Sequence, residues 1–158
     1  TPPVVPSFFF TPMSSFTCPL CVPHHPKELW RDSLVYVIDA STEELPGFVR
    51  VILTRHVKEM TDLSEAERLH VMRVVFCIES AMRRLLHPDK INLAEFGTMV
   101  PHVHWHIIAR FTDDAYFPES TWGIKQRQTS EAVLKTRKMT ACDFVRRLPS
   151  ILSQEFLD

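Results

Sequence analysis

The sequence predicts an α+β domain built on an antiparallel sheet. Segments rich in β-branched and aromatic residues stand on both sides of one strong amphipathic helix. At 158 residues, of which 45% are hydrophobic, the chain fits one compact domain whose core does not require disulfides. The 23% charged residues and the net charge of -1 argue against disorder and against general nucleic-acid binding. An anionic ligand therefore needs a local site.

The elements follow a proline-rich arm in a definite order. Proline removes a backbone donor, and seven of these residues stand before residue 27, which makes a core element there unfavourable. Two adjacent strands are expected at 33–39 and 48–53, and two more at 91–96 and 103–111 around a turn at 97–101. One or two helices are expected within 130–156.

The long helix has a clear start and stop. Ser64 can cap its free amides while Glu67 reaches back as in a capping box, and His87-Pro88 should end it. Its apolar face is expected to comprise Val71, Val75, Ile78, Met82 and Leu85.

Three of the eight histidines, His102, His104 and His106, stand at alternate positions of the last predicted strand. Successive strand side chains point to opposite faces, so the three should share one face, with Val103, Trp105 and Ile107 on the other. Three adjacent imidazoles cannot all be protonated cheaply. At least one is therefore expected to stay neutral, as a nucleophile or a metal ligand.

The run His-Val-His-Trp-His-Ile-Ile, residues 102–108, resembles the His-φ-His-φ-His-φ-φ motif (φ, apolar) of the histidine-triad (HIT) superfamily. Asn92, Gly97 and a strand-end His56 after Arg55 stand in the order typical of it, over about residues 18–111. The resemblance implies an antiparallel sheet of about five strands with one long helix packed on it and a C-terminal helical segment. The expected organisation is an arm at 1–17, a HIT domain at 18–111, and an extension at 112–158, helical and packed on the same domain.

The resemblance also implies an enzyme that hydrolyses or transfers at the α-phosphate of a dinucleoside polyphosphate or a nucleotide phosphoramidate. His104 would be the nucleophile, with its far ring nitrogen donating to a backbone carbonyl. His106 would stabilise the charge that develops on phosphate or leaving group. A nucleotide-binding or zinc-stabilised interaction protein with little turnover is the alternative. DNA deadenylation lacks a supporting basic run.

Nucleotide contacts are expected by the same resemblance. Asp39 would bind ribose hydroxyls, although it could equally end a strand and start a turn. Asn92 would support the ribose or phosphate side, although it could equally be an ordinary polar residue at a strand edge. Family members commonly place a glutamine or asparagine, then a serine or threonine, before the triad, whereas this chain has Thr98 and Met99. Gly97, Thr98 and Met99 are therefore expected to contact phosphate through their backbone.

A metal site is also expected. Cys18 and Cys21 have the two-residue gap of a thiolate pair on one tetrahedral ion. The resemblance supplies His56 and His102 as the other two ligands of a structural zinc, and no organic cofactor is expected. A free thiol pair, a thioredoxin-type redox pair, and rival ligands among the histidines at 24–25 are the alternatives.

The expected partner is a small-molecule nucleotide, a homodimer is expected by similarity, and nucleic acid is not. Nowhere do about 18 uninterrupted apolar residues occur, so no membrane association is expected and the protein should be cytoplasmic. Arg110, Asp113 and Asp114 are interpreted as solvated loop charges.

Overall fold

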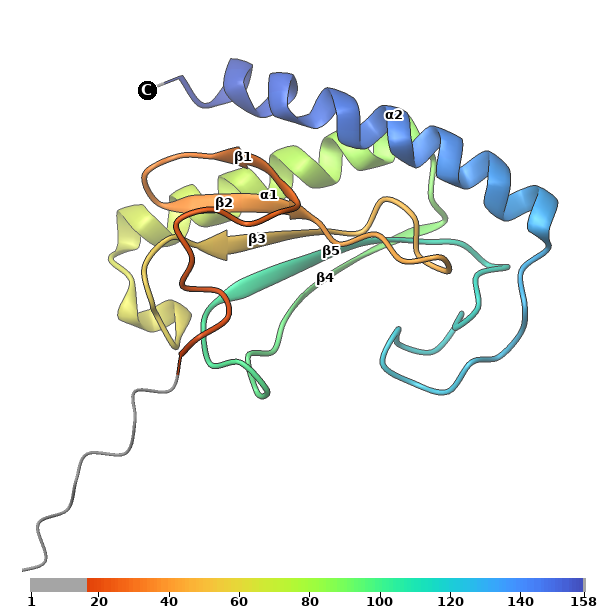
Figure 1. The fold of residues 1–158 in the computed structure, drawn as a ribbon, viewed down its shortest axis with the longest axis horizontal. Coiled ribbons are helices and arrows are strands. Elements are labelled where there is room, and N and C mark those ends of the chain that lie inside the picture. Colours follow the sequence, from red (N-terminus) through yellow and green to blue (C-terminus); the bar gives the residue numbers. More distant parts are fainter. Residues whose placement is uncertain (1–16, 158) are drawn as a thin grey trace, which may run out of the picture.

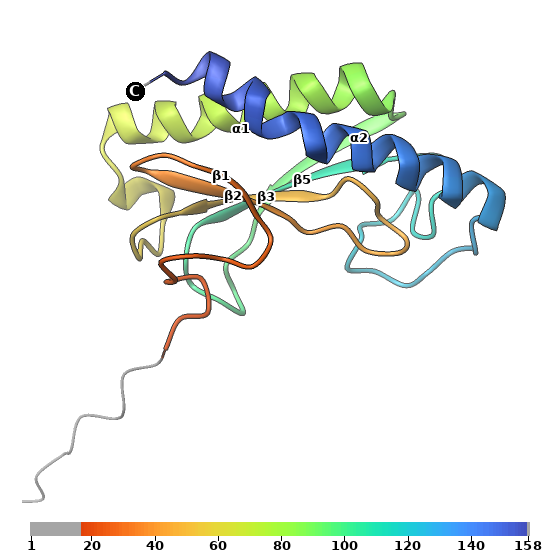
Figure 2. The same cartoon turned by 45° about the horizontal axis from the view of Figure 1, so that its top comes forward.

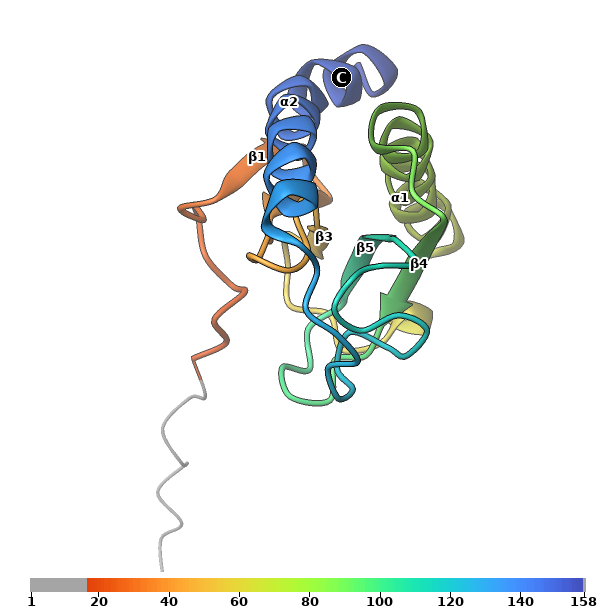
Figure 3. The same ribbon diagram turned by 90° about the vertical axis from the view of Figure 1, so that its right-hand side faces the viewer.

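The computed structural model describes residues 17–157, in which five antiparallel strands form one sheet of order β1-β2-β3-β5-β4. Two long helices lie side by side on one face of it (Figures 1 and 3). The elements are β1 (Glu28–Arg31), β2 (Val35–Asp39), β3 (Val49–Leu53), η1 (Met60–Asp62), α1 (Glu65–Leu86), β4 (Lys90–Glu95), β5 (His104–Arg110) and α2 (Glu131–Glu155). The predicted α+β fold is confirmed. The predicted arm lies outside the described residues apart from Thr17, and the division into arm, domain and extension stays a prediction.

The first two strands differ from the expected single segment at 33–39. Asp32 accepts hydrogen bonds from the backbone amides of Leu34 and Val35, both at 2.8 Å. This turn delays the start of β2 and folds the preceding residues back as the short strand β1. Four residues are too few for an alternation pattern to be recognised in the sequence.

Helix α1 begins as predicted, because the Ser64 hydroxyl accepts from the amide of Glu67. The predicted capping box is not completed. The Glu67 side chain instead pairs with Arg55 at 2.5 Å. The helix ends at His87, whose φ of 50° places it in the left-handed region just before Pro88.

The C-terminal region forms a single helix, α2, which packs on α1 and β1. Its buried side chains are Ala141, Phe144, Leu148 and Leu152, and they join those of α1 and the sheet in one core. Within residues 17–157, no helix combines the length and apolar composition needed to cross a bilayer.

The two faces of the sheet are used differently. Val103 and Ile107 are fully buried in the core beneath the helices, as the alternation predicted. On the opposite face, Tyr36 and Ile52 are covered by the segment that precedes β1 (Figure 2). The connection from β5 to α2 also descends on that side, away from the helices (Figure 1). The histidine-bearing face is therefore framed by two loops.

Candidate functional site

The central histidine has a defined orientation. Its Nδ1 lies 2.6 Å from the carbonyl oxygen of His102, so Nδ1–H donates to that acceptor and Nε2 keeps its lone pair. Strand β5 begins at His104, and the pairing of β3 with β5 places Ile52 opposite His104 and Arg50 opposite His106. The imidazoles of His104 and His106 are 5.0 Å apart between centroids. One ring thus offers a free nitrogen beside a second ring.

His106 is enclosed by aromatic side chains. The indole of Trp122 stacks on it with centroids 5.0 Å apart and planes 20° apart, and Phe48 meets its edge at 5.5 Å. Its ring is 4% exposed, and neither nitrogen has a hydrogen-bond partner among the described residues. Burial, followed by the charges of Arg50 and His104, lowers the pKa of His106 to about 3. His106 is therefore a neutral imidazole with an unused N–H.

This burial predicts a pH dependence. An unfolded histidine binds a proton below about pH 6.5, whereas folded His106 stays neutral down to about pH 3. Its contribution to stability is thus present above about pH 6.5 and is lost as the pH falls toward about 3, at about 1.4 kcal/mol per pH unit. The unfolding free energy of His106→Gln, measured by urea denaturation, should therefore decrease less than that of wild type between about pH 6.5 and 4. Parallel curves for variant and wild type would contradict the assignment.

A hollow of about 550 Å³ opens over these rings. It is lined by Arg50, Phe96, Gly97, Thr98, Met99, Val100, His104, His106, Ser120 and Trp122. Gly97 has a φ of 65°, which favours glycine and turns the backbone under the hollow. Met99 is 91% exposed, so its side chain projects into solvent. Both catalytic candidates and the predicted turn residues therefore share one cavity.

Asp39 and Asn92 do not line this cavity. Asp39 follows Val35 and Val37 in strand alternation, so it faces the helix side and lines a hollow with Lys138 of α2. The Asn92 side chain is occupied, because its Oδ1 accepts from Arg110 at 2.8 Å. The structure leaves these two outside the cavity.

The interpretation of Arg110 and Asp114 as solvated loop charges is wrong. They are 3% and 2% exposed and form an ion pair at 2.8 Å. Arg110 also donates to the carbonyl oxygen of Glu119, which fixes the loop that carries Trp122. Asp113 is exposed as expected and pairs with Arg137. A buried network, stabilised by these bonds, thus positions the aromatic cover of His106.

Sequence reasoning missed Arg50, Phe96 and Trp122. Trp122 lies in a stretch without periodicity, so no local signal identified it. Arg50 interrupts an otherwise apolar strand, which was the available signal. Its position opposite His106 depends on strand register.

The four predicted metal ligands come together. Nδ1 of His102 lies 3.4 Å from Sγ of both Cys18 and Cys21, and 3.3 Å from Nδ1 of His56. Sγ of Cys21 lies 3.3 Å from the same His56 nitrogen. In a tetrahedral zinc site with ordinary bond lengths, a sulfur and a nitrogen lie about 3.5 Å apart and two nitrogens about 3.3 Å. The donor set fits a zinc ion.

His102 is also oriented for this role. Its Nε2 donates to the carbonyl oxygen of Leu53 at 2.7 Å, which leaves Nδ1 as the lone-pair nitrogen toward the cysteines. Burial lowers the pKa of His102, which favours the neutral ligand form. His102 is 0% exposed, and its backbone carbonyl oxygen accepts the hydrogen bond from His104 Nδ1. One residue therefore joins the two sites.

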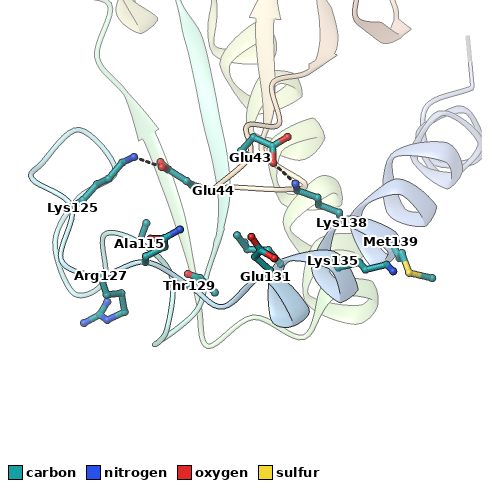
Figure 4. Close-up of a pocket in the computed structure, with 12 residues that line it drawn as sticks. Glu43, Glu44, Ala115, Lys125, Arg127, Thr129, Glu131, Lys135, Lys138 and Met139 are labelled. Atoms are coloured by element: carbon teal, nitrogen blue, oxygen red, sulfur yellow. Dashed lines mark hydrogen bonds and ion pairs between the residues drawn. The ribbon is translucent and has the colours of Figure 1, made fainter.

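A second hollow, of about 830 Å³, lies between the 43–44 turn, the loop before α2 and the start of α2 (Figure 4). Glu44 pairs there with Lys125, and Glu43 with Lys138. These charges are mutually compensated. This hollow contains no histidine or cysteine, so it lacks the nucleophile that the other cavity has.

Known proteins resemble this chain in sequence. The family model described as HIT domain matches residues 26–113. An AP-4-A phosphorylase of Mycobacterium tuberculosis is 24% identical over 123 residues, or 74% of this chain. The chain spans 62% of that relative's length.

Solved structures are similar as well. A histidine triad protein of Bradyrhizobium japonicum is 27% identical with a TM-score of 0.62, over 77% of this chain and 89% of its own. A zinc-bound histidine triad family protein of Mycobacterium smegmatis is 20% identical with a TM-score of 0.51, over 82% of this chain and 87% of its own. At 20% identity, the similarity to the second structure shows a shared fold alone.

Proposed function

Because the chain belongs to the HIT domain family, we propose that it is a nucleotide hydrolase that acts at an α-phosphate through a nucleotidyl-His104 intermediate. The observation that carries this proposal is the 2.6 Å contact from His104 Nδ1 to the carbonyl oxygen of His102, which leaves the lone pair of Nε2 free on a ring that lines the cavity. The relative named AP-4-A phosphorylase supports a dinucleoside polyphosphate, and a nucleotide phosphoramidate is the other candidate.

The reaction has two displacements. Nε2 of His104 attacks the α-phosphorus, a P–N bond forms, and the bond to the leaving group breaks with its electron pair going to that group. Water then attacks the same phosphorus, the P–N bond to His104 breaks, and a nucleoside monophosphate leaves as the water proton passes to solvent. A phosphate acceptor in place of water would give a nucleoside diphosphate, which is transfer.

Neighbouring groups would stabilise the phosphate during both steps. His106, neutral and unpartnered, would donate its N–H to a phosphate oxygen. The backbone of Gly97, Thr98 and Met99 would supply further contacts from the turn. We do not assign nucleotide contacts to Asp39 or Asn92, since neither lines the cavity.

A zinc ion, if held by Cys18, Cys21, His56 and His102, would cross-link the N-terminal segment to the sheet. Its contribution would be structural, because all four ligand positions of a tetrahedral site are occupied by protein atoms. A homodimer and a cytoplasmic location are further parts of the proposal, and size-exclusion chromatography with light scattering tests the first.

The test is to incubate the protein separately with diadenosine tetraphosphate and adenosine 5′-phosphoramidate, with and without inorganic phosphate. We expect AMP as a product, and mass spectrometry should locate a transient adenylyl group on the peptide that contains His104. A nucleoside diphosphate formed only with added phosphate would identify transfer rather than hydrolysis. Absence of any nucleotide product would contradict the proposal and favour a binding role.

A further inference from the structure

Arg50 is a cation in the wall of the histidine cavity that lacks a carboxylate partner. It lies on β3 directly opposite His106 and lines the hollow together with His104. Within residues 17–157 it forms no ion pair, and its Nε is buried without a hydrogen bond. Its guanidinium carbon lies 5.2 Å from the centroid of the Phe48 ring.

The other arginine in this part of the sheet shows what a compensated site looks like. Arg110 is bound by Asp114, Asn92 and the carbonyl oxygen of Glu119. Buried charges are expensive unless they are paired and hydrogen-bonded, and Arg110 follows that rule. Arg50 is half-buried, and burial lowers its pKa, yet its buried Nε has no hydrogen-bond partner among the described residues. An arginine left in this state at a cavity wall indicates that its partner is a ligand.

The cavity chemistry favours an anion. Arg50 is permanently charged, and its planar fork matches the oxygens of phosphate. The His106 nitrogens nearby are likewise without partners in the described chain. No acidic residue lines the hollow. Arg50 Nε–H and the N–H of His106 are therefore donors without partners among the described residues, and an oxygen-rich anion would satisfy both.

We propose that Arg50 binds a phosphate of the leaving group, so that dinucleoside polyphosphates, and not phosphoramidates, are the preferred substrate class. This inference rests on the proposed function. Cleavage of a P–O bond places negative charge on the departing polyphosphate, which a guanidinium stabilises. Cleavage of a P–N bond releases an amine that must instead gain a proton, which Arg50 does not supply at neutral pH. Arg50 should therefore assist one reaction and not the other.

The experiment compares wild type with Arg50→Leu and Arg50→Lys on diadenosine tetraphosphate and adenosine 5′-phosphoramidate. Arg50→Leu should lower kcat/KM for the tetraphosphate about 10- to 100-fold, as expected for loss of a charge-assisted hydrogen bond. It should change phosphoramidate turnover less than about threefold, which also shows that the variant folds. Arg50→Lys should retain part of the tetraphosphate activity. Arg146→Leu removes an exposed arginine of α2 as a control, and should change neither.

Equal losses on both substrates, or no loss on either, would overturn the proposal. Binding of inorganic tripolyphosphate, measured by calorimetry, gives an independent readout. It should weaken about 10-fold or more in Arg50→Leu, and equal binding by wild type and variant would also count against the proposal. If wild type cleaves neither substrate but tripolyphosphate binding depends on Arg50, the hydrolase function fails while the anion site stands.

Discussion

His104→Ala is expected to lower kcat by at least about 10³-fold on any substrate the protein turns over, with little change in thermal stability. The variant loses the nitrogen that forms the covalent intermediate, and losses of this size are typical when a nucleophile is removed. His104 is only partly buried, and its hydrogen bond goes to a backbone carbonyl at the sheet surface, so packing should change little. Steady-state kinetics and thermal denaturation provide the two measurements.

Two further variants make this result specific. His104→Gly leaves space for added imidazole, which should restore part of the turnover if the ring acts as a nucleophile. His24→Ala removes an exposed histidine of the N-terminal segment and should retain wild-type rates. Full activity in His104→Ala would refute the mechanism, and lack of imidazole rescue together with a large loss of stability would indicate a structural role.

Local patterns predicted the sheet and its chemical face. The alternation of histidines with apolar residues gave the strand around His104, and Val103 and Ile107 lie in the core as that alternation required. The cap at Ser64 located the start of α1. These predictions succeed because strand alternation and helix capping depend only on residues that are close together in the sequence.

Long-range features were not predictable in the same way. The burial of Arg110 depends on Asp114 and on carbonyls of the following loop, and nothing in the neighbouring residues reveals that burial. Trp122 stacks on His106 from a loop that Arg110 and Arg127 hold through backbone carbonyls far from the histidines in sequence. For Asp39 the uncertain feature was local. Residues adjacent in a strand face opposite sides of the sheet, and the resemblance did not determine which side Asp39 faces.

The metal ligands depended on resemblance for half of their number. The gap between Cys18 and Cys21 is a local signal, but it gives no information about His56 or His102. Those two are 35 and 81 residues away from Cys21, and only folding brings their nitrogens to 3.3–3.4 Å from its sulfur. The histidines at 24–25 are nearer in sequence, yet neither belongs to the cluster.

Cys18→Ser is expected to abolish stoichiometric zinc binding and to lower Tm by about 10 °C or more. Cys18 is buried, and zinc binding at this cluster would connect the N-terminal segment, the end of β3 and the start of β5. Metal binding contributes directly to folding, and a loss of roughly 3–5 kcal/mol corresponds to a shift of this size in a chain of this length. Metal analysis of the purified protein and differential scanning calorimetry provide the measurements, and a chelator should destabilise wild type in the same direction.

Cys142→Ser is the matched control, because Cys142 is exposed on α2 and outside the cluster. It should keep both zinc content and Tm. Cys18→Ser should lower kcat only modestly, because a bound metal would affect the reaction only through His102, whose backbone carbonyl oxygen accepts the hydrogen bond from His104. Unchanged zinc content in Cys18→Ser would dismiss the site. A loss of kcat as large as that of His104→Ala in a still-folded Cys18→Ser protein would show instead that the metal takes part in the reaction.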